Sequence, residues 1–180
     1  MAGLCEGGNE PAGSLKAICQ LVTFSQRNHK EFNRRISSAW KAFWSLKFIW
    51  TDKTINRNLK FEALETCIIP VLLYGCQTWT LSERQRSSIQ TCQRKMQRKI
   101  LGITLRDRMT NETLQRLTNT TDAEERATAT KWTWGRHVAR LHQTRWTRAI
   151  TMWDPYVGKR GQGRPRLRWS DMFTKEAGKQ

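Results

Sequence analysis

Tryptophan and basic residues are closely interleaved in the last third of the chain, between residues 131 and 171. Five of the nine Trp residues lie in this stretch, among many Arg and Lys residues. An indole ring is costly to leave in water, and a dense set of guanidinium groups is costly to bury without partners. Contacts from guanidinium groups to phosphates, and from rings to bases, would satisfy both. The stretch is therefore typical of a surface that binds nucleic acid.

The candidate ligands of a phosphate chain fall into four groups. The first group lies on an expected helix around residue 137, and the second lies just after that helix. The third lies in a Gly/Arg-rich segment from residue 158, and the fourth lies on an earlier helix. Trp146, between Arg145 and Arg148, is the foremost candidate for stacking on a base. The alternative for every group is an ordinary solvated basic surface. The predicted nucleic-acid-binding residues are Arg136, His137, Arg140, Arg145, Trp146, Lys159, Arg160, Arg164, Arg166, Arg168, Trp169, Arg94, Lys95 and Arg98.

No set of residues in the sequence has the spacing of a metal or catalytic centre. His137 and His142 are five residues apart, so they align poorly on one helix, and no Cys is near them. Asp154 and Asp171 are isolated in the sequence, and Asp171 is expected to pair with Arg168 or to cap a helix. We therefore expect no catalytic residue, no metal, no cofactor and no small-molecule substrate.

The charge of the whole chain favours a polyanionic partner. The net charge is +17, from 32 Lys and Arg against 15 Asp and Glu. It is +6 over residues 1–60, +4 over 61–120 and +7 over 121–180, so the excess is spread along the chain. Such a field favours association with the phosphate backbone of RNA or DNA, largely without regard to base sequence.

The cysteines and the apolar runs indicate a compartment. Cys67 and Cys92 fall on apolar helical faces, so we expect buried free thiols and a reducing, intracellular location, either nuclear or cytoplasmic. The longest apolar run, residues 67–74, is too short to span a bilayer, so no membrane partner is expected. The number of cysteines is odd, and no two of them form a CxxC pair. They are Cys5, Cys19, Cys67, Cys76 and Cys92.

Apolar spacing predicts that the fold is all-α. Residues that recur at intervals of three and four predict an amphipathic helix over 28–50 and a second helix from residue 54. Proline removes a backbone donor and clashes one turn back, so the second helix should kink or restart at Pro70. Gly75 is expected to mark its end.

A capping-box pattern, Ser82 with Gln85 three residues later, predicts the start of the next helix. Gly102 is expected to end it. Its apolar stripe is Ile89, Cys92, Met96 and Ile100. Two later helices are predicted, one after Thr110 with Leu114 and Leu117 inward, and one opened by Asp122.

Five blocks of residues, in order, resemble one part of a known protein family. The blocks are EFNRRI (31–36) with AW (39–40), CIIPVL (67–72) with YG (74–75) and TW (78–79), CQR (92–94) with ILGI (100–103), KWTW (131–134) with HVAR (137–140), and RW (145–146) with GRPRLRW (163–169) and Asp171. They resemble the region that follows the polymerase palm in non-LTR (LINE-type) retrotransposon reverse transcriptases. The resemblance covers residues 20–177.

The resemblance implies a thumb and the basic helical region after it, without the palm or the endonuclease domain of the full proteins. The palm of that family carries an Asp-Asp pair that holds two metal ions, and no Asp-Asp occurs in this sequence. This implies a non-catalytic fragment of an RNA-directed DNA polymerase, which would hold a template–primer duplex or the element's RNA by phosphate contacts. The alternatives are a helical module that docks on a reverse transcriptase palm, a nuclease or polymerase that uses other residues, and a non-functional transposon remnant.

The expected organisation has four parts. They are a disordered leader over residues 1–17, a thumb-like helical bundle over 18–105, a basic Trp/Arg-rich helical region over 106–157 and a Gly/Arg-rich basic tail over 158–180. One position departs from the family, because Arg136 stands where a Gly usually precedes His137. Either Arg136 obstructs a close approach to this helix, or it points outward to phosphate.

Overall fold

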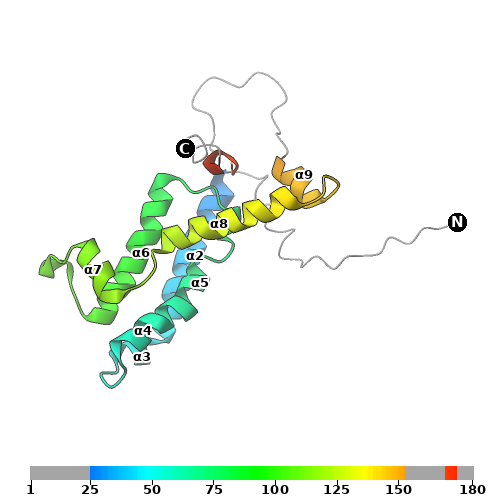
Figure 1. Cartoon of the computed structure of the whole chain (residues 1–180). Helices are drawn as coiled ribbons and strands as arrows, with labels where there is room; N and C mark the ends of the chain where they lie inside the picture. Colours follow the sequence, from blue (N-terminus) through cyan, green and yellow to red (C-terminus); the bar gives the residue numbers. More distant parts are fainter. Residues whose placement is uncertain (1–24, 153–168, 174–180) are drawn as a thin grey trace.

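The computed structural model describes residues 25–152 and 169–173, and within these residues every regular element is a helix (Figure 1). The prediction of an all-α fold is confirmed. The predicted leader and residues 158–168 and 174–180 of the predicted tail lie outside the described residues. None of the helices in the described ranges has the length and apolar character needed to cross a bilayer.

The helix predicted over 28–50 is observed as α2 (Ser25–Ser45) and α3 (Lys47–Thr51). The chain leaves helical geometry at Leu46, where φ is −96° and ψ is 20°. The ring of Trp50 stacks on Phe43, with centroids 5.0 Å apart, and Trp50 Nε1 donates a hydrogen bond to the Phe43 carbonyl at 2.6 Å. The break therefore depends on the contact between Trp50 and Phe43, which the spacing of apolar residues in the sequence does not predict.

The second predicted helix is observed as α4 (Arg57–Ala63), η1 (Leu64–Ile68) and α5 (Ile69–Leu72). η1 is a π-helical turn, and the amide of Ile69 donates to the carbonyl of Leu64. This wider turn comes just before Pro70, whose ring would clash with the carbonyl four residues back in an α-helix. The predicted irregularity at Pro70 is observed as a change from π-helical to α-helical geometry at Ile69, one residue earlier, and Gly75 follows with a φ of 77°.

α6 (Glu83–Leu101) begins and ends where the sequence predicts. The Ser82 N–H donates to Gln85 Oε1 at 2.9 Å, and the Gln85 N–H donates to Ser82 Oγ at 3.4 Å, which completes the capping box. Gly102 ends the helix with a φ of 70°. The predicted stripe of Ile89, Cys92, Met96 and Ile100 is buried.

Three further helices follow: α7 (Asn111–Thr118), α8 (Ala123–Arg140) and α9 (Trp146–Met152). Thr110 caps α7 by accepting the Thr113 N–H at 3.2 Å. Leu114 is buried as predicted, but the prediction for Leu117 is wrong, because its side chain is 46% exposed. The buried residues of this short helix are Leu114 and Thr118, one turn apart, and residue 117 lies to the side of that line.

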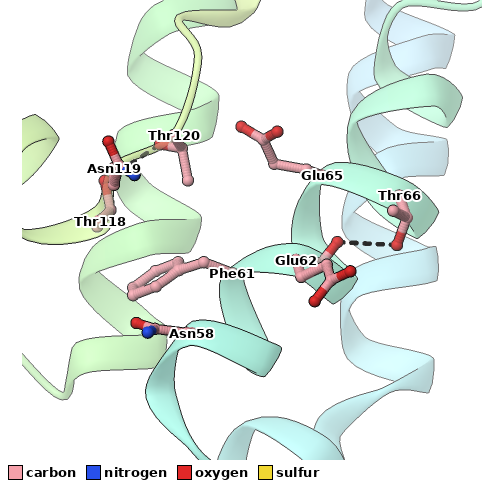
Figure 2. A pocket seen from close by; sticks show the side chains of 8 residues that line it. All are labelled: Asn58, Phe61, Glu62, Glu65, Thr66, Thr118, Asn119 and Thr120. Carbon is pink, nitrogen blue, oxygen red and sulfur yellow. Dashed lines mark hydrogen bonds between the residues drawn. The ribbon is translucent and has the colours of Figure 1, made fainter.

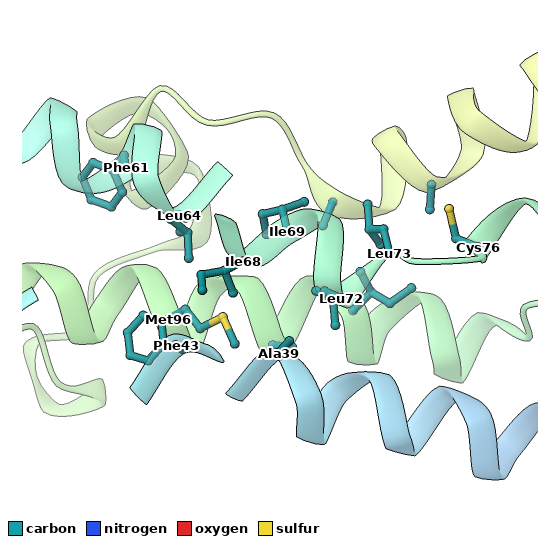
Figure 3. Packing of buried hydrophobic residues seen from close by; sticks show 14 of the residues in the cluster. Ala39, Phe43, Phe61, Leu64, Ile68, Ile69, Leu72, Leu73, Cys76 and Met96 are labelled. Atoms are coloured by element: carbon teal, nitrogen blue, oxygen red, sulfur yellow. The ribbon is translucent and has the colours of Figure 1, made fainter. Parts of the chain in front are cut away.

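One apolar core joins α2, η1, α5 and α6 (Figure 3). Leu64 and Ile68 from η1 meet Phe43 from α2 and Met96 from α6. Ala127 extends this core to α8. α8 is therefore packed on the bundle near its start, and in Figure 1 it runs from there towards α9.

The prediction that Cys67 is buried is wrong, whereas Cys92 is buried as predicted. Cys67 lies in the π-helical turn, where each residue advances by a smaller angle than in an α-helix. Leu64 and Ile68 take the inward side of this turn, and residue 67 is displaced towards solvent. Burial raises the pKa of the thiols of Cys76 and Cys92 from 9.0 to about 11.

Candidate nucleic-acid interface

The start of α8 is fixed to α6 by side chains that also contact the α8 backbone. Asp122 caps α8 by accepting the Glu124 N–H at 2.8 Å, and its second carboxylate oxygen accepts from Arg94 Nη2 at 3.1 Å. Gln93 accepts the Ala123 N–H at 2.8 Å. Because these contacts satisfy the first amides of the helix, they set the direction in which α8 leaves α6.

The three predicted binding residues on α6 differ in how far the protein already uses them. Arg94 pairs with Asp122, and Arg98 donates to Asn111 Oδ1 at 2.8 Å. Both arginines are partly buried, whereas Lys95 is exposed. A guanidinium held by a carboxylate must give up that contact before it binds phosphate. Arg98 has neutral partners and no carboxylate among the described residues, and Lys95 has neither an ion pair nor a hydrogen bond there, so Lys95 is the most available of the three.

Residues 169–173 pack on α8 through two aromatic side chains. The Phe173 ring lies edge-on to Trp132, with centroids 4.7 Å apart, and 4.8 Å from the Trp169 ring. The indole N–H of Trp169 donates to the Gln77 carbonyl at 2.7 Å. A Cβ atom at Gly135 would lie 2.8 Å from the Phe173 ring. The absence of a side chain at Gly135 therefore lets the ring lie against the helix.

Lys131 is a buried lysine at the centre of this packing. Its Nζ donates to the Trp79 carbonyl at 3.2 Å and lies 5.3 Å from the centre of the Trp169 ring and 5.7 Å from that of Phe173. Carbonyl and cation–π contacts together offset the cost of taking an ammonium group out of water. Trp169, a predicted ligand of nucleic acid, is thus placed in the packing of the protein, with its N–H and its ring engaged.

The C-terminal end of α8 and the start of α9 bring five predicted binding residues to one end of the molecule (Figure 1). These residues, Arg136, His137, Arg140, Arg145 and Trp146, are all exposed, and the Trp146 side chain is 80% exposed. No carboxylate among the described residues pairs with Arg136, Arg140 or Arg145. Arg136 is exposed, and the close approach to this helix is made at Gly135.

Arg148 holds α9 against the end of α8. Its Nη1 donates to the carbonyls of Ala139 at 2.9 Å and Leu141 at 2.7 Å. The last carbonyls of a helix lack partners within the helix and carry partial negative charge, so a guanidinium there is favourable. Thr147, next to Arg148, is buried. Arg148 is therefore used by the fold, and it anchors the backbone of α9 two residues after Trp146.

A cavity of about 460 Å³ lies near the opposite end of α8, beside α4, η1 and the segment between α7 and α8 (Figure 2). Glu65 accepts the Thr121 N–H at 2.8 Å, which ties η1 to that segment. The lining contains two carboxylates and no Lys or Arg, so it would repel phosphate. Its residues are Asn58, Phe61, Glu62, Glu65, Thr66, Thr118, Asn119 and Thr120. The 18 residues of α8 span about 27 Å and separate this acidic end from the basic end.

Five of the predicted binding residues lie outside the described residues. They are Lys159, Arg160, Arg164, Arg166 and Arg168. In ranges 25–152 and 169–173, no group of three His, Cys, Asp or Glu side chains could hold a metal ion. The ring of His137 lies 5.4 Å from that of Trp134, its neighbour one turn back on α8.

Sequence reasoning missed three residues that build this end of the molecule: Lys131, Gly135 and Arg148. A glycine inside a helical pattern often has a packing reason, so Gly135 carried a usable signal. Lys131 lies at the helical spacing of the buried Ala127 and Val138, which is a signal for burial. The partners of Lys131 and Arg148 carried no signal, because they are backbone carbonyls and rings that only the fold brings near.

Comparison with known proteins gives one relative of clear similarity. An uncharacterized transposon-derived protein of Caenorhabditis elegans is 31% identical over 150 residues, which are 81% of this chain and 53% of that protein. The chain thus spans about half the length of this relative. No protein-family description and no solved structure matches the chain. The similarity supports a transposon-derived origin.

Proposed function

We propose that this chain is the nucleic-acid-binding part of a transposon-encoded reverse transcriptase, and that it holds RNA or DNA through phosphate contacts. The observation that carries the proposal is the group formed by Arg136, His137, Arg140, Arg145 and Trp146, here called the α8–α9 surface. All five side chains are exposed, and no described carboxylate pairs with its arginines. The transposon-derived relative and the ordered blocks that resemble reverse transcriptases support the same proposal.

Arginines without a carboxylate partner gain the most from binding phosphate. A guanidinium makes two parallel hydrogen bonds to phosphate, and no ion pair within the protein has to break first. Each neutralised phosphate also releases counterions from the nucleic acid, so affinity falls as salt rises. Because these contacts go to the backbone, we expect little dependence on base sequence.

The test is a binding titration of the full chain with labelled RNA, DNA and hybrid oligonucleotides at several salt concentrations. The triple variant Arg136→Ala, Arg140→Ala, Arg145→Ala should bind about tenfold more weakly or worse. It should also lose about 2 to 3 units from the slope of log affinity against log salt. A matched control, Lys53→Ala, Arg106→Ala, Arg116→Ala, removes the same charge from exposed sites between α3 and α4, between α6 and α7, and on α7. Figure 1 shows α3, α4 and α7 far from α9.

The control separates a specific surface from a general charge effect. Under the proposal it changes affinity by less than about threefold, because only the long-range field is reduced. Equal losses in both triple variants would contradict the proposal. They would mean that the net charge of +17 binds nucleic acid without a defined surface.

We also propose that the chain binds without chemistry of its own, since its sequence contains no Asp-Asp pair of the kind that holds two catalytic metal ions. Polymerase and nuclease assays of the purified chain with magnesium test this. We expect no turnover above that of the buffer. Reproducible turnover that is abolished by His137→Ala or Asp171→Asn would overturn it.

A second candidate function is docking on another protein, such as a reverse transcriptase palm. The observation that favours it is the pair of exposed rings on α2 and α3: Trp44 is 48% exposed and Phe48 is 66% exposed. Exposed large apolar side chains are common at protein interfaces. Co-elution of the chain with a palm domain in gel filtration, lost on Trp44→Ala with Phe48→Ala, would support this function.

A further inference from the structure

We infer that Trp146 is a stacking platform for an unpaired base, so that the α8–α9 surface prefers single-stranded nucleic acid to a continuous duplex. The inference rests on the proposed function and adds the class of ligand. Trp146 is 80% exposed. In the part of the chain that the structure describes, no ring, cation or hydrogen-bond partner contacts its indole.

The other described tryptophans are engaged by the protein. Trp50 and Trp79 are buried, and Trp169 contacts Phe173 and donates to a carbonyl. Even Trp44, which is half exposed, stacks on Trp40 and carries the ammonium of Lys99 5.2 Å from its ring centre. Trp146 therefore differs from them in offering both faces of its ring to a ligand.

The surroundings of Trp146 favour a nucleic acid as the occupant. Arg145 precedes it in the sequence, and Arg140 ends the helix before the turn; both are exposed and unpaired among the described residues. An exposed ring near unpaired guanidinium groups in the chain suits a ligand that combines a base with phosphates. An apolar protein patch would have to bury these guanidinium groups without partners, at a cost.

The ring reaches a base only where that base is not already stacked. In a continuous duplex, neighbouring bases cover both faces of every internal base, so the backbone and the base edges in the grooves face the protein there, and the base faces do not. In a single strand, a base can leave its neighbours and lie on the indole, which adds a contact that the duplex cannot make. The arginines would bind both kinds of ligand, whereas Trp146 would contribute to one.

The backbone that carries Trp146 is held in place before a ligand arrives. Arg148 donates to two carbonyls at the end of α8, and the side chain of Thr147, next to Trp146, is buried. With the backbone already in place, only the side-chain torsions of Trp146 have to be ordered on binding, so less of the stacking energy is offset. Because the Trp146 side chain itself is exposed, its replacement should leave the fold intact.

The experiment compares the full wild-type chain, Trp146→Ala and Trp146→Phe on three ligands of equal length. These are a single-stranded RNA, the blunt duplex of the same sequence, and a single strand in which the central nucleotides lack bases. We expect Trp146→Ala to weaken binding to the single strand about tenfold and to the duplex by less than twofold. Trp146→Phe should retain most of the affinity, since it keeps a ring.

The strand with missing bases isolates the stacking contact, because it keeps the phosphates. The wild-type chain should bind the strand with missing bases about as weakly as Trp146→Ala binds the intact single strand. Trp146→Ala should bind both strands with about the same affinity. Equal losses of Trp146→Ala on duplex and single strand, or no loss on either, would overturn the inference. If the triple arginine variant still loses affinity for both ligands in that case, the proposed function survives. If wild type binds neither ligand, both fail.

Discussion

The Phe173 ring lies so close to Gly135 of α8 that a Cβ atom at residue 135 would be 2.8 Å from the ring. The ring cannot easily retreat, because it also contacts Trp132 and Trp169 at centroid distances of 4.7 and 4.8 Å. Residues 135 and 173, which are 38 positions apart in the sequence, can therefore pack together only because residue 135 has no side chain.

Gly135→Ala should lower the stability of the chain by about 1 to 3 kcal/mol, because the added methyl group overpacks the contact with Phe173. In the Phe173→Ala background the sign should reverse. There the methyl group has room, and alanine stabilises a helix interior by about 1 kcal/mol relative to glycine. Urea unfolding of the two single variants and the double variant measures both effects. Stabilisation by Gly135→Ala in the wild-type background would show that the ring does not lie against α8.

A substitution at Trp169 distinguishes a structural role of this residue from a role in binding nucleic acid. Trp169→Phe keeps a ring beside Lys131 but removes the hydrogen bond to the Gln77 carbonyl, so we expect a loss of about 1 kcal/mol in stability. Its affinity for RNA should stay within about twofold of wild type, because the ring is engaged by the protein. The opposite result, a large loss of affinity at unchanged stability, would make Trp169 a nucleic-acid ligand, as its sequence context predicts.

Arg94 and Lys95 are adjacent basic residues on α6 that should behave differently. Arg94→Ala leaves the Asp122 carboxylate without its ion-pair partner, 3.1 Å away, in a site where the two side chains are only 19% and 9% exposed. We expect a loss of about 2 kcal/mol in unfolding free energy. Lys95→Ala removes the same charge from an exposed site and should change stability by less than about 0.5 kcal/mol. Paired thermal unfolding curves check this, and equal melting temperatures would refute it.

The buried thiols should react late with alkylating reagents. Burial raises the pKa of Cys76 and Cys92 to about 11, and the thiolate is the reactive form. At pH 8 the exposed Cys67 should therefore be modified well before either of them, as peptide mapping by mass spectrometry would measure. Modification of all three at one rate would show that the core around Cys92 opens readily.

The same pKa shift predicts how Cys92 affects stability as pH rises. Below pH 9 the thiol is protonated in the folded and the unfolded chain, so its contribution is fully present. Between pH 9 and 11 the unfolded chain ionises while the folded chain does not, so this contribution is lost. Wild type should therefore lose more stability than Cys92→Ala over this range. Comparing the two cancels the other groups that titrate there, and parallel curves would contradict the shift.

Features that depend on a few neighbouring residues were predictable from the sequence. The capping box of Ser82 with Gln85 and the left-handed Gly102 fix both ends of α6, because each bonds or turns within a few residues. The interruption at Pro70 was predictable for the same reason, although the π-helical form of η1 was not. In the π-helical turn Cys67 lies at the surface, so the prediction of its burial, which assumed α-helical spacing, placed it on the wrong side of the helix.

Features that depend on distant contacts were not predictable. Leu46 breaks the first helix because Trp50 returns to Phe43, and Leu117 faces solvent because α7 buries a single line of residues. At the candidate interface, residue type and spacing predicted the exposed group on α8 and α9. They did not tell Arg94, which an Asp holds, from Lys95, because paired and unpaired cations look alike in a sequence.

The hydrogen bond from Trp169 to the Gln77 carbonyl joins residues 92 positions apart. During synthesis, Lys131 and its helix emerge from the ribosome while the rings that cover the ammonium group have yet to be made. Contacts of such long range close slowly, since a large loop must be ordered first. The α8 helix should therefore reach its final packing only after residue 173 is translated, and a nascent chain arrested earlier should remain sensitive to proteases around Lys131.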